Sequence, residues 1–137
     1  MAKDILVTDV LSESMTKSGA KLIRRLDELD SEVKSAFWLF LSDEKSWKLV
    51  ISSPLVGKDG PREFYKRVIS SNSQADENES VVSLNDIGVA NIDHPIVQLM
   101  KLAIGTGEYD VSGIRFSRNT INGTFIEDSL IYRSSVS

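Results

Sequence analysis

One short stretch near the start of the chain is apolar on both of its sides. In SAFWLFLS an extended backbone points Phe37, Leu39 and Leu41 one way and Trp38 and Phe40 the other. A strand that is buried on both faces needs a cover on each of them. The pattern therefore predicts a central strand, and it leaves open whether this chain supplies both covers or a neighbouring molecule supplies one.

The same stretch is predicted to form a hairpin with the strand that follows. VKSAFWLFLS and SWKLVISS flank the short polar connection DEK. In the second strand Trp47, Leu49 and Ile51 share one face, while Lys48 and Ser52 make the other face more polar. The first strand is thus expected to be the more interior of the two, or to turn one face toward another chain.

A long first helix is predicted over about Asp9 to Leu29, where apolar residues recur every three or four positions. Thr8 or Asp9 is a candidate cap for its first turn, and Ser12 marks an alternative start. The shared apolar face consists of Leu11, Met15, Gly19, Leu22, Ile23, Leu26 and Leu29.

Two shorter helices are predicted further along the chain. Pro61 opens the segment PREFYKRVIS, since proline is tolerated in the first turn of a helix. The segment IVQLMKLAI follows Asp93, a candidate cap, and Pro95. It is apolar almost all round, so we expect a buried helix that ends at the glycine of position 105.

Turn signals separate the remaining strands. VVSLNDIGVANI is predicted to contain the third strand, and VSGIRFSRN and GTFIEDSLIYR to form a closing hairpin. Asn122-Gly123 between them is the strongest short-range hairpin signal in the sequence. The resulting order is α-β-β-α-β-α-β-β. Two hairpins without regular alternation of strands and helices favour an α+β fold, with a mainly antiparallel sheet of about five strands and three helices.

The whole chain, residues 1–137, is expected to form a single α+β domain, because its length suits one core. The segment SSNSQADENES, at about residues 70–80, has no large apolar side chain. It is predicted to be a mobile polar loop and not a domain boundary, since too little chain lies on each side of it for two cores.

Composition narrows the function classes. Hydrophobic residues make up 41% and charged residues 26% of the chain, as in ordinary globular proteins. The net charge of −4 argues against a dedicated nucleic-acid binder, whose domain is usually basic. The absence of cysteine excludes a disulfide, a thiolate zinc site and a cysteine nucleophile. No apolar run has the length of a signal peptide core or a membrane span, which predicts a cytoplasmic location without a membrane partner.

No catalytic or metal-binding motif is recognisable. His94 is the single histidine, and Asp93 beside it is better explained as a helix cap than as a metal ligand. No serine lies in a G-x-S-x-G turn. Glu127 and Asp128 are neighbours on a strand, so their side chains point to opposite faces and cannot act as a local pair. We therefore favour a protein that is not an enzyme and has no cofactor or metal.

Basic side chains are concentrated in three parts of the chain. On the first helix no acid lies between Ser14 and Leu26, and acids follow the basic residues at once. This order is the reverse of the one that the helix dipole favours, which suggests a role for the basic residues. If the basic groups converged, they would suit a phosphate backbone; the alternative is a solvated face on which they pair with acids. The candidates are Lys17, Lys21, Arg24, Arg25, Lys58, Arg62, Lys66, Arg67, Arg115 and Arg118.

The doubly apolar strand gives the leading hypothesis for function. Exposed aromatic patches commonly mark interfaces, so Trp38, Phe40 and Trp47 are candidate interface residues. The sequence then favours a non-enzymatic protein-interaction or assembly module that binds a protein partner or itself. A monomer with both strand faces covered is the competing structural interpretation. The alternative function is a small enzyme, or a binder of a phosphate ligand or nucleic acid, that uses the basic groups of the first two helices.

Overall fold

The strand that begins at Ser35 lies in the middle of a five-stranded sheet in the computed structural model, which describes residues 10–135. In this part of the chain the fold is mixed α+β, with four helices, the large sheet and a separate two-stranded sheet. The helices are α2 (Glu13–Glu28), α3 (Pro54–Asp59), α4 (Pro61–Ser73) and α5 (Pro95–Ala103), and a 3₁₀ turn spans Leu84–Asp86. The strands are β1 (Ser35–Leu41), β2 (Ser46–Ser52), β3 (Ile87–Ala90), β4 (Ile114–Arg115), β5 (Asn119–Ile121), β6 (Thr124–Ile126) and β7 (Ser129–Ser134).

The large sheet has the order β3-β2-β1-β7-β4 and is mixed, where the sequence predicts a mainly antiparallel one. β1 is antiparallel to both of its neighbours, and β4 is antiparallel to β7. β3 instead runs parallel to β2, with Leu49 opposite Ile87 and Ser52 opposite Ala90. The connection explains this difference, because α3 and α4 carry the chain back along the sheet before β3 begins.

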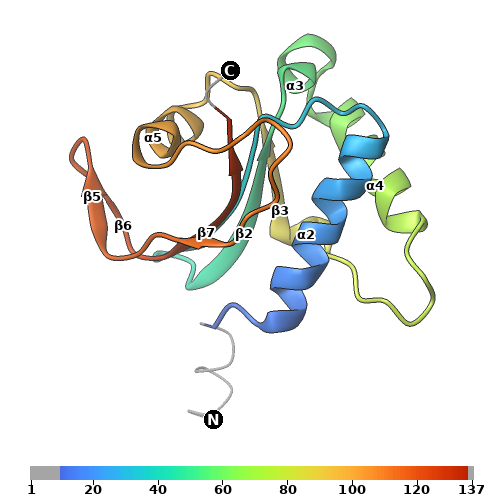
Figure 1. Ribbon diagram of the computed structural model, residues 1–137, viewed down its shortest axis with the longest axis horizontal. Coiled ribbons are helices and arrows are strands. Elements are labelled where there is room, and N and C mark those ends of the chain that lie inside the picture. Colours follow the sequence, from blue (N-terminus) through green and yellow to red (C-terminus); the bar gives the residue numbers. More distant parts are fainter. Residues whose placement is uncertain (1–9, 136–137) are drawn as a thin grey trace.

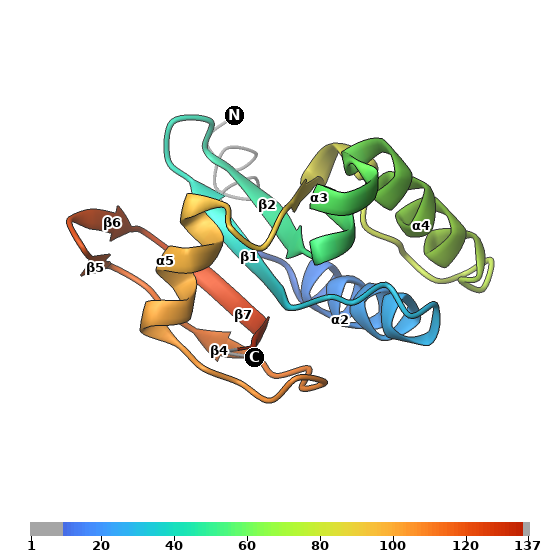
Figure 2. The same cartoon turned by 90° about the horizontal axis from the view of Figure 1, so that it is seen from above.

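The two faces of the sheet are covered by different parts of the same chain (Figure 1, Figure 2). On one face Trp38 packs in a cluster with Leu22 of α2 and Phe64 of α4. On the other face Phe37 packs in a second cluster with Met100 of α5 and with residues of the β5–β6 hairpin. One molecule therefore supplies both covers that the doubly apolar strand requires.

α2 lies unusually close to the sheet at Gly19. A Cβ at this position would be 2.4 Å from the Tyr132 hydroxyl and 2.9 Å from the Trp38 ring nitrogen. The indole N–H of Trp38 donates to the Tyr132 hydroxyl at 2.9 Å, and that hydroxyl donates to the carbonyl of Thr16 at 2.5 Å. Every polar atom of this buried contact is thus satisfied, as close packing without water requires. Burial raises the pKa of Tyr132 to about 12, because the charged phenolate is disfavoured there.

Ser12 caps α2, which confirms the alternative start given by the sequence. Its side-chain oxygen accepts a hydrogen bond from the amide of Met15 at 3.1 Å, and the helix begins at Glu13. The other candidate caps, Thr8 and Asp9, lie outside the described residues.

The structure contains a fourth helix, α3, between β2 and α4, where the sequence predicts three helices in all. Ser53 accepts a hydrogen bond from the amide of Leu55 at 3.1 Å, and Pro54 occupies the first turn, so a short capped helix forms despite the turn-rich sequence. α4 begins at Pro61, as predicted, but continues to Ser73 and so includes the first residues of the predicted polar loop.

α5 is only partly buried, where the sequence predicts a fully buried helix. Met100 faces the core with no exposed surface, whereas 65% of Leu102 is exposed. The cap also differs: the amide two residues beyond His94 donates to its ring nitrogen Nδ1 at 3.2 Å, while Asp93 instead accepts from the side chain of Asn91. α5 lies on one face of the sheet (Figure 2), and Leu102 is not part of the cluster that Met100 joins there.

The predicted closing hairpin divides into two ladders. Asn122 and Gly123 form its tip, with φ angles of 47° and 81°, as a tight two-residue turn requires. Only β5 and β6 pair around that turn, in the small sheet. β4 leaves this ladder and joins the edge of the large sheet, where Ile114 lies opposite Ile131 of β7. The hairpin folds over α5 and forms part of its cover (Figure 1).

Candidate functional site

The three aromatic interface candidates lie largely in the interior. Trp38 is fully buried and Trp47 is 4% exposed. Phe40 is half-buried, and the centre of its ring is 5.4 Å from that of Trp47. The guanidinium of Arg115 lies over the Trp47 ring at 5.6 Å. Residues of the same chain thus cover these aromatic rings, so the need for a second molecule to cover them no longer exists.

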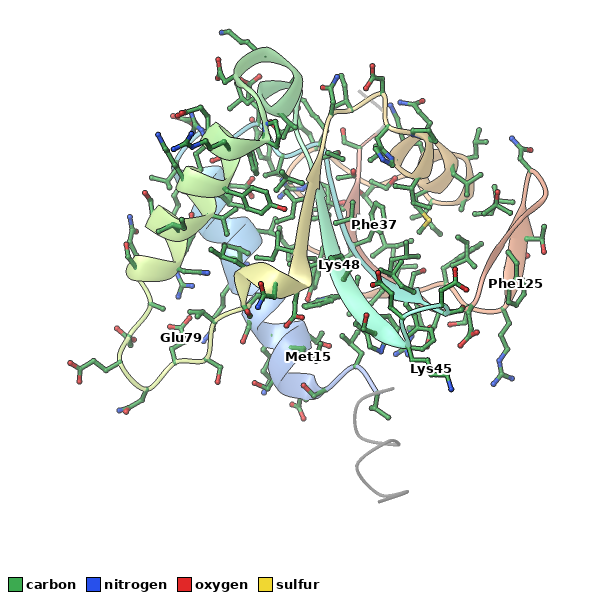
Figure 3. The ribbon with its side chains drawn as sticks, turned by 180° about the vertical axis from the view of Figure 1, so that it is seen from behind. Met15, Phe37, Lys45, Lys48, Glu79 and Phe125 are labelled. Carbon is green, nitrogen blue, oxygen red and sulfur yellow. The ribbon has the colours of Figure 1, made fainter. Side chains whose placement is uncertain are left out.

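The basic residues of α2 are largely paired with acids. Lys17 lies 2.9 Å from Glu13, and Glu79 forms an ion pair with Arg25 and lies 3.8 Å from Lys21. The hydrogen bond from Arg25 lowers the pKa of Glu79 below its usual value. Glu79 lies in the polar segment after α4 and approaches α2 from outside (Figure 3). The unusual charge order of this helix is therefore explained by an acid from elsewhere in the chain.

The basic residues of α3 and α4 also have separate contacts. Lys66 pairs with Glu63 at 3.1 Å. Arg67 donates to the carbonyl of Leu29 at 3.0 Å and so satisfies the end of α2. These side chains line an open hollow of about 590 Å³ on the surface. Exposed Lys58 and Arg62 have no ion pair within the described residues.

Arg115 and Arg118 also have different surroundings. Arg115 donates to both carboxylate oxygens of Asp128, at 2.7 and 2.5 Å, and this contact lowers the pKa of Asp128 below its usual value. Arg118 is exposed and has a φ of 47°, and its backbone amide donates to Glu127. The basic candidates that are engaged thus have separate partners, which are acids for α2, Lys66 and Arg115 and a backbone carbonyl for Arg67.

A groove of about 360 Å³ opens elsewhere, between the end of β1, the first turn of α5 and β6. We call it the β6 groove. Its apolar lining comes from the α5 side of the sheet and from the facing elements: Leu39, Leu41, Ile96 and Ile126. Leu39 and Ile126 are almost fully buried, whereas Leu41 and Ile96 are half-buried. The groove is therefore hollowed into the outer margin of the second apolar cluster.

Phe125 lines the β6 groove and exposes 59% of its surface. It lies on the hairpin, away from the large sheet (Figure 3). Its neighbour Ile126 points inward, since adjacent strand residues face opposite ways. A large aromatic side chain on the open side of an apolar groove is a feature that protein-binding surfaces share.

The backbone of β6 has an open edge. Because Ile121 and Thr124 close the two-residue turn, they form the hydrogen-bonded pair, and the next pair, Thr120 and Phe125, is not hydrogen-bonded. The N–H and C=O of Phe125 then point away from β5. Within residues 10–135, β6 pairs with β5 alone. An edge of this kind can accept one more strand.

The rim of the β6 groove is acidic. Asp43 and Glu44 reach it from the β1–β2 connection, and Glu127 from the chain just after β6. Ser42 donates to Glu127 at 3.0 Å and thereby joins the two sides of the rim. No lysine or arginine lines the groove among the described residues. The negative potential of this rim favours a positively charged occupant.

Sequence reasoning missed this site, although one signal for it exists. GTFIED contains two adjacent apolar residues, Phe125 and Ile126, on a predicted strand. Adjacent strand residues face opposite ways, so one of the two must be exposed unless both faces are covered. The same argument was applied to residues 35–42, where both faces prove to be covered.

Comparison with protein-family models, with curated proteins and with solved structures finds no match to this chain, so its function has to be inferred from its own geometry. Among the described residues, no helix combines the length and the apolar character needed to cross a bilayer. In the same residues no three side chains of histidine, aspartate or glutamate lie close enough together to hold a metal ion.

Proposed function

We propose that the protein is a protein-interaction module that binds an extended, basic segment of a partner protein in the β6 groove. The observation that carries this proposal is Phe125, an exposed aromatic residue on an unpaired strand edge beside an apolar groove. We place the module in the cytoplasm, as the sequence predicts.

An extended peptide suits the groove better than a helix does. Added to β6, a peptide strand would form main-chain hydrogen bonds with Phe125, and its alternate side chains would point toward the apolar lining. Lysine or arginine at the intervening positions would lie near Asp43, Glu44 and Glu127. Such charge complementarity mainly speeds association and selects the partner.

The alternative function, a binder of nucleic acid or a phosphate ligand through α2 and α4, has less support. Arg25 and Lys21 are engaged by Glu79, and Arg67 is engaged by the backbone at the end of α2. The argument for self-association was that a second molecule covers Trp38. The chain itself covers Trp38, so this argument no longer supports self-association. A second copy of the chain therefore enters the proposal only as a competing occupant of the β6 groove.

Defined peptides test the proposal directly. We would titrate the protein with a labelled eight-residue peptide of alternating valine and lysine, and with matched peptides that carry glutamate for lysine or two central prolines. Fluorescence anisotropy should detect binding of the valine–lysine peptide alone, because glutamate is repelled by the rim and proline cannot join a strand. Amide NMR shifts should be centred on Leu41 and Phe125.

Two pairs of variants locate the binding. Phe125→Ala should weaken binding about tenfold or more, whereas Tyr109→Ala, which removes another exposed aromatic ring outside the groove, should not. Glu44→Lys should weaken it, and Glu77→Lys should not. Equal effects within either pair, or no amide shifts at the groove, would overturn the proposal. A wild-type dimer that Phe125→Ala converts to a monomer would identify a second copy as the occupant.

A further inference from the structure

The closing hairpin turns over between its two ladders. The pairing register is the same in both of them, so the two strands run on without a slip. Residues four apart on a straight strand share a face. Leu130 nevertheless packs in the cluster on the α2 side of the sheet, whereas Ile126 packs in the cluster on the α5 side. The chain therefore changes face at residues 127 and 128, and this change leaves Phe125 exposed.

The carboxylate of Asp128 lies at this bend and accepts hydrogen bonds from both strands of the hairpin. Its Oδ1 accepts from Nε of Arg115 at 2.7 Å, from the hydroxyl of Ser117 at 2.5 Å and from the amide of Ser129 at 2.9 Å. Its Oδ2 accepts from a second guanidinium nitrogen of Arg115 at 2.5 Å. One side chain thus connects β4 and the link after it to the start of β7.

Arg115 also contacts the core of the large sheet. Its guanidinium lies 5.6 Å from the centre of the Trp47 ring, and the face of an aromatic ring attracts a cation. Trp47 belongs to β2 and is only 4% exposed, so its position is fixed by the core. The bend of the hairpin is therefore joined to the sheet through Asp128, Arg115 and Trp47 in turn.

The other contacts of the hairpin fix its orientation less well. Ile121 and Ile126 pack on the α5 side, but hydrophobic burial has no preferred direction. A two-stranded ribbon outside a larger sheet is only marginally stable by itself. Arg118 in the link has a φ of 47°, which residues other than glycine adopt rarely, so the surroundings have to maintain it. Directional, charged hydrogen bonds at the bend meet this need.

We propose that Asp128 is a positioning residue of the β6 groove, whose hydrogen bonds hold Phe125 in the orientation that a bound peptide requires. This inference rests on the peptide-binding function proposed above. Phe125 lines the groove, whereas neither Asp128 nor Arg115 is among the described residues that line it, so both act through the position of the hairpin. If only a fraction of the molecules has the binding orientation, the apparent affinity falls in proportion to that fraction.

Position and charge make opposite predictions for one variant. Asp128→Asn removes a negative charge, and Arg115→Gln removes a positive one. If the two residues acted only through their electric field, Asp128→Asn would weaken the binding of a basic peptide and Arg115→Gln would strengthen it. If they position the hairpin, both variants weaken binding, because each breaks the same contact. The sign of the change for Arg115→Gln therefore separates the two roles.

The test uses the labelled valine–lysine peptide and fluorescence anisotropy, at a temperature where thermal unfolding shows each protein to be folded. Asp128→Asn and Arg115→Gln should each weaken binding about fivefold or more, and the double variant should lose little more than the stronger single one. Asp30→Asn removes the same charge as Asp128→Asn at an exposed site between α2 and β1, and should bind like the wild type. Stronger binding by Arg115→Gln, or wild-type affinity in Asp128→Asn, would refute the proposal.

A variant that does not fold has a milder substitute. Ser117→Ala removes one of the four hydrogen bonds to Asp128 and leaves the ion pair with Arg115 in place. It should weaken peptide binding by a smaller factor than Asp128→Asn. Wild-type affinity in Ser117→Ala, together with wild-type order in its hairpin, would count against the positioning role.

Backbone NMR relaxation of the free protein keeps this inference separate from the proposed function. Order parameters of residues 119–126 should be about 0.85 in the wild type and fall below about 0.6 in Asp128→Asn and Arg115→Gln, while those of β1 and β2 stay unchanged. With that fall present, a wild type that does not bind the peptide would overturn the proposed function but not the hold of Asp128 on the hairpin. Peptide binding by the wild type, with unchanged order parameters and affinity in both variants, would overturn the positioning role alone.

Discussion

Arg133 of β7 is fully buried and binds both carboxylate oxygens of Asp27 on α2, at 2.9 and 2.7 Å. The same guanidinium donates to the carbonyls of Val33 and Asp110, at 3.1 and 2.9 Å. One side chain near the end of the described chain therefore joins the first helix, the entry to β1 and the loop before β4. Among residues 10–135 Asp27 is the only carboxylate that pairs with Arg133, so the stability of the fold should depend on that contact.

Asp27→Ala should lower the free energy of unfolding by about 3–5 kcal/mol, because it leaves a buried guanidinium without its counter-charge. Glu28 is the next residue and is exposed, so Glu28→Ala is the matched control and should change the free energy of unfolding little. The double variant Asp27→Leu/Arg133→Met should recover most of the loss, since no buried charge remains. Urea unfolding measures all three. A cost for Asp27→Ala as small as that of Glu28→Ala would show that water replaces the carboxylate.

Gly19→Ala should destabilise the protein by about 1 kcal/mol or more through overpacking, although alanine is the better helix former. The new Cβ would lie 2.4 Å from the hydroxyl oxygen of Tyr132. In a Tyr132→Phe background that oxygen is absent, so the same substitution should cost clearly less. Thermal unfolding of the four proteins completes the cycle. Equal costs in the two backgrounds would mean that α2 shifts away from the sheet instead.

Much of the architecture follows from short-range patterns. The parity of residues 35–42, the proline at the start of α4 and the Asn122-Gly123 turn are all local, and each of them is found as expected. The parallel pairing of β3 with β2 is not local, because it depends on where α3 and α4 place the chain. For the same reason the departure of β4 from the closing hairpin could not be predicted.

The candidate sites were harder to predict than the fold. A strand that is apolar on both sides is compatible with two covers from one chain or with one from a partner, and only the folded position of α5 decides between them. The small cavity beside Lys34, Ser52 and Ser135 combines residues that are far apart in the chain, so sequence spacing carries no trace of it. The exposure of Phe125 could have been predicted in part, because Phe125 and Ile126 are adjacent apolar residues on a strand and one of the two has to face outward.

Acid should weaken the contact between Asp128 and Arg115. The hydrogen bond from Arg115 holds the pKa of Asp128 below its ordinary value of 3.8. In the pH range between the lowered folded value and that unfolded value, the unfolded chain binds more protons, so stability increases with pH. The contribution of this carboxylate is therefore fully present above about pH 3.8 and is lost as the pH falls through the folded pKa.

Asp128→Asn tests this pH dependence. The variant should be less stable than the wild type at pH 7, and the difference should shrink as the pH falls below 3.8, the ordinary value for an aspartate. Asp43→Asn is the control, since Asp43 is exposed and makes no ion pair within the described residues. Urea midpoints over this pH range provide the measurement. A difference that stays constant with pH would mean that the charge of Asp128 contributes nothing.

The ion pair between Arg25 and Glu79 should protect the polar segment after α4 from proteolysis. Limited proteolysis is expected to cleave the chain first at residues 70–80, and a protease specific for glutamate can cleave there after Glu77. Arg25→Gln removes the ion pair and leaves the segment's own sequence intact, so cleavage should become several-fold faster. Arg24→Gln is the control. Arg24 is exposed and makes no ion pair within residues 10–135, so this substitution should not change the cleavage rate. Equal rates in both variants, measured by mass spectrometry, would show that the hydrogen bond from Ser18 to the carbonyl of residue 80 holds the segment without Arg25.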